Sequence, residues 1–246
     1  MALTAVHGIV IQETNYSESS KILNVITKEY GKIGILSKGC RSIKSRLRSV
    51  STKMTYGLFQ IQYKENGLSI LSAVDVLKSF NNIMSDIGRI SYAAYLMDLT
   101  DQVLKQTDSL ELFDMLIASL SKIDEGMDPA IITCIMELKL LDDLGIRPNI
   151  DCCSICGSTK SIITIDAGVG GYVCKGCYTN QKIYSEKLVK LIRMLYYVDI
   201  NKITKLDISV DVREQLQEFI LNYYEQYTGL YLKSKQFLNN LHKLGI

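Results

Sequence analysis

The chain has 246 residues and a net charge of +2, a length that suits two modest domains better than one. Residues 1–20 lack the basic start and apolar core of a secretory signal, and no apolar run approaches the roughly eighteen residues of a membrane helix. We therefore expect a cytoplasmic protein without membrane association. The small net charge hides an asymmetry: residues 1–80 contain eleven Lys or Arg against five Asp or Glu, whereas residues 81–246 contain seventeen against twenty-one.

The first 80 residues have the alternation of β-strands. In the run 56–63, for example, Phe59 and Ile61 share one side, and Asn66-Gly67 predicts a hairpin turn into the next run. The predicted strands cover residues 5–12, 20–28, 32–38, 56–63 and 68–76. Five short strands without room for crossover helices are typical of a small closed barrel. We predict an N-terminal five-stranded OB-type β-barrel as the first domain, residues 1–80.

The predicted barrel contains a basic stretch, because no Asp or Glu occurs between Tyr30 and Lys64. Its cations are Lys32, Lys38, Arg41, Lys44, Arg46, Arg48, Lys53 and Lys64. Most of them fall in residues 39–53, the predicted loop between the third and fourth strands. Such a field attracts polyanions such as nucleic acids. The alternative is a solvated loop whose charges only keep the protein in solution.

Several aromatic residues could add stacking surfaces for bases, since barrels of this type commonly bind single strands with a cationic groove and aromatic faces. The candidates are Tyr16, Tyr30, Tyr56, Phe59 and Tyr63. Packing inside the barrel is the alternative for each, because the sequence does not say which strand face is outward.

After Phe80 the period of apolar residues changes from two to about 3.6, which predicts helices. Asp128 and Pro129 have the residue types of an N-cap and a first helical position, and Gly145 suits a helix end. The predicted helices cover residues 83–105, 110–123, 129–145, 185–197, 210–227 and 232–244. The fold class is thus α+β: the barrel, then a helical domain over residues 81–246 with an insertion at about 150–180.

That insertion contains two Cys-x-x-Cys pairs separated by the seventeen residues 157–173. Its four cysteines are Cys153, Cys156, Cys174 and Cys177. This spacing favours one tetrahedral Zn²⁺ site, and Gly157, Gly170, Gly171 and Gly176 allow the chain to curl around a metal. Four sulfurs leave no open position for water or substrate, so we predict one structural zinc ion.

Redox activity and disulfides are the alternatives for such pairs, but an expected reducing compartment keeps the thiols free for metal. Cys152 adjoins the first pair and could compete as a ligand, although the spacing from Cys153 to Cys156 matches that of the second pair. Cys134 lies in an apolar helical pattern and is expected in the core.

Catalytic constellations are scarce, and we expect no enzyme. The only histidines are His7 and His242, and the sequence contains neither a phosphate-binding Gly-x-x-x-x-Gly-Lys-Ser/Thr loop nor the His-x-Glu of zinc deaminases. An enzyme that uses Cys40 as its nucleophile is the weaker alternative, because nearby cations could lower its pKa but no base is identifiable.

The order of these parts resembles the RecO family of bacterial recombination mediators. The likeness extends over nearly the whole chain and is strengthened by local motifs. These motifs are residues 8–23, 27–31, 37–41, 144–157, 170–177 and 232–238. The chain departs from the family pattern at Cys40, usually a small residue, at the extra thiol of Cys152, and in residues 47–54, which extend the basic stretch.

The resemblance implies a protein that binds single- and double-stranded DNA and anneals complementary strands. It also implies that the protein works with RecR to load the RecA recombinase onto strands coated by single-strand binding protein, whose C-terminal tail it contacts, in the bacterial cytoplasm at the nucleoid. The motif match and the basic stretch together give the candidate DNA-binding residues Lys38, Gly39, Arg41, Lys44, Ser45, Arg46, Arg48 and Lys53. The four cysteines match the family's zinc ligands. A zinc-stabilised protein-interaction module without nucleic-acid binding is the alternative function.

Overall fold

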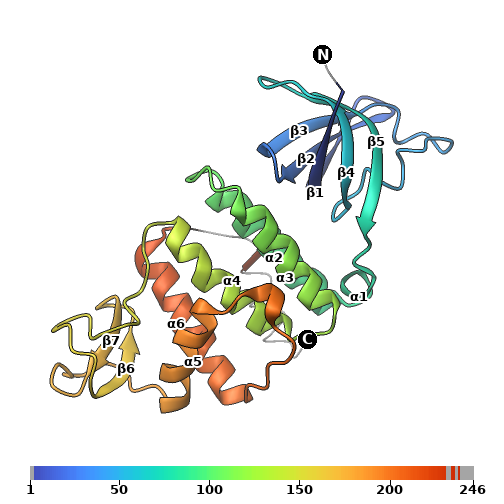
Figure 1. Cartoon of the computed structure of the whole chain (residues 1–246). Helices are drawn as coiled ribbons and strands as arrows, with labels where there is room; N and C mark the ends of the chain where they lie inside the picture. The colour runs from blue at the N-terminus through green and yellow to red at the C-terminus, as the bar shows by residue number, and fades with distance from the viewer. Residues whose placement is uncertain (1–2, 231–233, 236–237, 239–246) are drawn as a thin grey trace.

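A computed structural model of the chain describes residues 3–230, 234, 235 and 238. In Figure 1 the N-terminal barrel and the small β6–β7 hairpin lie at opposite ends of the molecule, with the helices between them. The barrel strands are β1 (Leu3–Tyr16), β2 (Ser20–Thr27), β3 (Gly31–Ser37), β4 (Tyr56–Gln62) and β5 (Ser69–Lys78). The predicted α+β class is therefore confirmed.

The five strands close into a barrel in the order β1-β2-β3-β5-β4, with β4 pairing back to β1. All neighbours are antiparallel except β3 and β5, which are parallel. Alternate side chains fill the interior, as the period-two pattern predicts. This interior contains Val6, Val10, Leu23, Val25, Ile35, Phe59, Ile61 and Leu71, each at most 4% exposed.

The helices of the described residues follow the barrel. They are α1 (Asn81–Met84), α2 (Ile87–Val103), α3 (Glu111–Asp124), α4 (Pro129–Asp143), α5 (Glu186–Tyr197) and α6 (Val210–Tyr227), with a 3-10 turn at Ile200–Lys202. Strands β6 (Ile162–Asp166) and β7 (Gly171–Cys174) lie between α4 and α5, where the insertion was predicted. The predicted helix 232–244 lies almost wholly outside the described residues.

The predicted helix 83–105 is wrong as a single element, because it is broken between α1 and α2. Asp86 has an extended backbone, and its side chain accepts a hydrogen bond from the Arg89 N–H. This N-cap satisfies a free N–H of the first turn of α2 and starts a new helix there. Asp128 and Ser185 cap α4 and α5 in the same way, so the predicted starts of those helices are confirmed.

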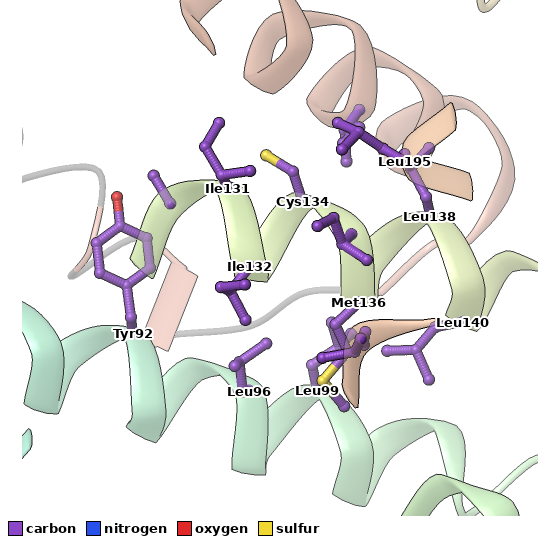
Figure 2. Close-up of a cluster of buried hydrophobic side chains, with 14 of the residues drawn as sticks. Tyr92, Leu96, Leu99, Ile131, Ile132, Cys134, Met136, Leu138, Leu140 and Leu195 are labelled. Carbon is purple, nitrogen blue, oxygen red and sulfur yellow. The ribbon is translucent and has the colours of Figure 1, made fainter. Parts of the chain in front are cut away.

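The helical core forms where α2 and α4 face each other. Figure 2 shows Leu96 and Leu99 of α2 pointing toward Ile132 and Met136 of α4, all of them fully or almost fully buried. The Cys134 side chain leaves the opposite side of α4 toward the other helices and is 1% exposed. Burial raises the pKa of the Cys134 thiol well above its ordinary value. Cys134 is thus a core residue, as predicted.

The barrel packs on the helices through apolar residues of its own strands and connections. Ile9, Ile26 and Met54 belong to the same buried cluster as the helices, rather than to the barrel interior. Ion pairs surround this contact: Lys32 with Asp101 at 2.5 Å, Lys28 with Asp114 at 2.9 Å and Lys78 with Glu125 at 3.6 Å. The helical domain therefore neutralises three of the barrel's cations.

Candidate nucleic-acid interface and metal centre

The connection between β3 and β4, residues 38–55, begins with a turn that is bound to the β1–β2 hairpin. Gly39 has a φ of +65°, a left-handed conformation that glycine adopts without strain. Its N–H donates to Ser20 Oγ at 3.2 Å, and the Arg41 N–H donates to the Ser19 carbonyl at 2.8 Å. The Arg41 guanidinium also donates to the Ser17 carbonyl at 3.2 Å. The connection thus leaves the barrel in a defined direction.

The rest of the connection has its own hydrogen bonds. The N–H groups of Ser42, Ser45 and Arg48 each donate to the carbonyl three residues earlier, at 3.1 to 3.2 Å. Leu47 packs against the barrel interior, and the Met54 N–H donates a hydrogen bond to the Val10 carbonyl at 2.8 Å. These contacts make the connection an ordered surface of the barrel rather than a solvated loop without structure.

The cations of this connection are exposed. Its six cations are Lys38, Arg41, Lys44, Arg46, Arg48 and Lys53. Within residues 3–230, 234, 235 and 238, none of these six side chains forms an ion pair, in contrast to Lys28, Lys32 and Lys78 on the side that faces the helices. Uncompensated cations on one surface attract polyanions strongly.

The uncharged members of the predicted DNA-binding set have structural contacts. Gly39 forms the first turn, and Ser45 Oγ accepts a hydrogen bond from the Leu47 N–H at 3.3 Å. Cys40 is 1% exposed and packs inward, so its sulfur is shielded from any substrate in solution. The anchoring serines 17, 19 and 20 were missed by the sequence reasoning, because nothing in a local pattern indicates which strand turn lies beside the loop.

The aromatic candidates divide into core and surface residues. Phe59 is fully buried in the barrel, and Tyr56 packs near Phe80 and Phe113, with ring centroids 6.2 and 6.3 Å away. Tyr30 stacks on Tyr63 with centroids 4.2 Å apart. Tyr16 is 49% exposed and Tyr30 is 41% exposed. The exposed rings of this set are therefore Tyr16 and Tyr30. Phe59 is a core residue, and Tyr63 packs against the barrel interior and against the Tyr30 ring.

The four predicted metal ligands come together. The Sγ atoms of Cys153, Cys156, Cys174 and Cys177 all lie within 4.8 Å of one another. Cys174 ends β7 and its N–H donates to Cys153 Sγ at 3.4 Å, while the sulfurs of Cys156 and Cys174 are 3.6 Å apart. Cys152 is not part of the cluster, because its sulfur contacts the Asn149 side chain at 3.4 to 3.5 Å instead.

The four thiols of the cluster affect one another's ionisation. Burial raises the pKa of the Cys153 thiol, but backbone N–H groups of Cys156, Cys174 and Ile155 outweigh it and hold the pKa at about 6. A hydrogen bond with the Cys156 side chain, together with burial, raises the pKa of Cys177 to about 12. Four thiolates cannot coexist at this distance without a positive charge between them.

The donor set fits a four-coordinate metal ion. Tetrahedral sulfur ligands of zinc, at about 2.3 Å from the ion, stand about 3.8 Å from each other. The sulfurs of Cys156 and Cys174, 3.6 Å apart, are close to that separation, and all four sulfurs lie within 4.8 Å of one another. With four thiolates bound, the ion would have no free position, so the arrangement suits a structural rather than a catalytic metal.

The cysteine module is continuous with the helical core. Ile165 of β6 and Tyr172 of β7 are buried in the cluster that contains the helices, and the Tyr172 hydroxyl donates to the Val189 carbonyl of α5 at 2.5 Å. The Tyr227 hydroxyl of α6 donates to the Ala167 carbonyl at 2.7 Å. A metal ion here would hold the hairpin that covers one end of the helices.

A closed barrel with an exposed basic connection, followed by a helical domain with a four-cysteine hairpin, defines the class of protein. A family model described as recombination protein O N terminal matches residues 1–80, and one described as recombination protein O C terminal matches residues 84–236. The chain belongs to this RecO family of DNA repair and recombination proteins.

Similar proteins named DNA repair protein RecO cover nearly the full length. The protein of Listeria innocua is 36% identical over 240 residues, which are 96% of this chain and 94% of that protein. The protein of Halalkalibacterium halodurans is 35% identical over 243 residues (97% and 95%), and that of Bacillus pumilus is 32% identical over 241 (96% and 94%). Among the helices that the structure describes, none is long and apolar enough to cross a membrane.

Proposed function

We propose that this protein binds single- and double-stranded DNA and anneals complementary strands. It acts with RecR to load RecA onto strands that single-strand binding protein has coated. The observation that carries the proposal is the set of six exposed cations on the ordered connection 38–55, which have no ion-pair partner among the described residues, in a chain of the RecO family. We place this activity in the bacterial cytoplasm, at the nucleoid.

The physical argument rests on what annealing requires. Two phosphate backbones repel each other, so an annealing protein has to neutralise both and leave the base edges free to pair. Exposed Lys and Arg side chains on a convex barrel surface can contact phosphates without enclosing the bases. Annealing makes and breaks no covalent bond, so the protein needs neither a nucleophile nor a general base.

We propose that the four-cysteine cluster holds one Zn²⁺ ion and that this ion is structural. Thiolates are preferred zinc ligands, and the cytoplasm keeps them reduced. The ion stabilises the β6–β7 hairpin, which lies at the far end of the molecule from the barrel (Figure 1). We therefore expect the ion not to touch DNA that is bound at the connection 38–55. Metal analysis of reduced, freshly purified protein should give about one zinc per chain.

Annealing of two complementary fluorescent oligonucleotides tests the proposal directly. The protein should accelerate annealing of bare strands and of strands coated with cognate single-strand binding protein, and added salt should weaken the effect. No acceleration, together with no DNA binding at low salt, would favour the alternative of a zinc-stabilised module that binds a protein partner. Binding of RecR and of a peptide from the acidic tail of single-strand binding protein is measured in parallel.

A further inference from the structure

Ile43 stands out on the basic connection because it is an apolar side chain that is 86% exposed. Among the described large apolar residues the next most exposed is Leu3, at 62%. Single apolar residues on a surface need no explanation by themselves. Ile43, however, lies among polar and cationic neighbours on the surface that we propose to bind DNA.

The backbone fixes the outward position of Ile43. The turn closed by the Ser45 N–H and the Ser42 carbonyl at 3.1 Å contains Ile43 and Lys44 at its two central positions. Leu47, the next apolar residue, packs inward against the barrel instead. The ordered connection therefore packs the Leu47 side chain against the barrel and presents that of Ile43 to the solvent.

Cations without an ion-pair partner among the described residues flank Ile43 in the sequence. Arg41 precedes it by two residues, Lys44 follows it directly and Arg46 lies three residues later, all exposed. A ligand of this surface must offer both negative charges and an apolar surface between them. A nucleic-acid strand does so, because its phosphates are spaced along stacked bases, and branched aliphatic side chains are known to enter between base steps.

We propose that Ile43 inserts between two adjacent bases of a bound DNA strand while the neighbouring cations hold the flanking phosphates. Insertion separates one stacked step, and the contacts to phosphate offset its cost. An unstacked base presents its pairing edge to an incoming complementary strand. The inference deepens the proposed function and rests on it, because it names the side chain that would position bases during annealing.

The test uses a single strand with 2-aminopurine flanked by adenines, whose emission is quenched by stacking and rises when a step opens. The wild-type protein should raise the emission, and Ile43→Ser should abolish most of the rise. Because phosphate contacts supply most of the affinity, the dissociation constant of Ile43→Ser should change by less than about tenfold. Ile183→Ser is the matched control, since Ile183 is 54% exposed and lies between β7 and α5, outside the connection 38–55 and the sulfur cluster.

The outcomes separate this inference from the proposed function. Salt-dependent binding by the wild-type protein without an emission change, or with the same change in Ile43→Ser, overturns the role of Ile43 alone. Absence of salt-dependent binding overturns both the role of Ile43 and the proposed function. Thermal unfolding of both variants verifies that the exposed substitutions leave the fold intact.

Discussion

Gly171 shows how one residue without a side chain can hold the cysteine module together. Its φ is +152°, and a Cβ at this position would lie 2.2 Å from the Asn149 carbonyl oxygen. The Asn149 carbonyl accepts the Tyr172 N–H at 2.8 Å, and the Asn149 N–H donates to the Gly170 carbonyl at 2.9 Å. This bridge brings the segment before the first cysteine pair against the strand that ends in the second.

We expect Gly171→Ala to separate the two segments and to lower the free energy of unfolding by about 1–3 kcal/mol through backbone strain, with further loss from the steric overlap. The metal content of the Gly171→Ala variant should also fall, because the two cysteine pairs lose their alignment. Gly176→Ala is the control, since its added Cβ would meet nothing nearer than 4.0 Å. Equal thermal unfolding and equal metal content in the two variants would contradict this account.

A buried carboxylate provides a second prediction at this scale. The Glu137 side chain is 2% exposed; it accepts a hydrogen bond from the Tyr95 hydroxyl and pairs with Lys235 Nζ, both at 2.6 Å. We expect Lys235→Met to destabilise the protein by about 3 kcal/mol, because it leaves a buried charge without its partner. Denaturant unfolding of the variant measures this change.

The matched control for that change is Lys190→Met, which removes an exposed pair with Glu186 one helical turn away. Its effect should stay below about 0.5 kcal/mol, as is usual for solvated pairs. Adding Glu137→Gln to Lys235→Met should restore part of the lost stability, because the charge is then gone. If Lys235→Met lowered the free energy of unfolding as little as Lys190→Met does, the buried pair would contribute little to stability.

Among the elements, the connection between β3 and β4 makes the clearest functional prediction. We expect alanine substitution of Arg41, Lys44, Arg46 and Arg48 to flatten the salt dependence of single-strand binding by about 0.7 log units per lost phosphate contact. Equilibrium binding over a salt series measures the slope. The fold should persist, because the anchoring bonds of the connection come mainly from its backbone and from Leu47.

A control of equal charge uses lysines elsewhere on the surface. Lys160, Lys175, Lys187 and Lys205 are exposed and, within the described part of the chain, have no ion-pair partner. Their replacement by alanine removes the same net charge from the helical domain. If this variant flattened the salt dependence of DNA binding as much as the loop variant does, the binding would follow from net charge rather than from the connection 38–55.

At the scale of the whole molecule, the barrel and the cysteine module are separated by the helices (Figure 1). Removal of the metal by a strong chelator, or Cys174→Ser, should therefore raise hydrogen exchange in residues 150–180 and α5 while the barrel amides keep their protection. The salt slope of DNA binding should stay unchanged. A barrel that loses protection together with the module would show that the ion stabilises the entire chain as one cooperative unit.

The division into domains at residue 80 stays a prediction. The barrel keeps an interior of its own, which would allow independent folding. Yet Ile9, Ile26 and Met54 are buried against the helices, so an isolated barrel would expose them. Expression of residues 1–80 with and without polar substitutions at these positions would measure how much the barrel depends on its neighbour.

The sequence by itself determined most of the elements and which four cysteines come together. Period-two and period-3.6 patterns located the five barrel strands and nearly all the helices, and capping residues such as Asp128 marked helix starts, because these signals depend on neighbours a few residues away. The spacing of the two Cys-x-x-Cys pairs identified the sulfur cluster for the same reason. Strands β6 and β7 of the insertion were not predicted. The break at Asp86 was missed, since an extended residue inside an apolar pattern leaves only a weak local signal.

Only the tertiary structure decided which charges are free. Lys32 and Lys44 look alike in the sequence, but Lys32 is paired with Asp101 of α2 and Lys44 is not paired within the described residues. Likewise, Phe59 became a core residue and Cys152 was excluded from the sulfur cluster by contacts between distant segments. Ion pairing, burial and metal geometry depend on which segments meet in space, and local patterns do not contain that information.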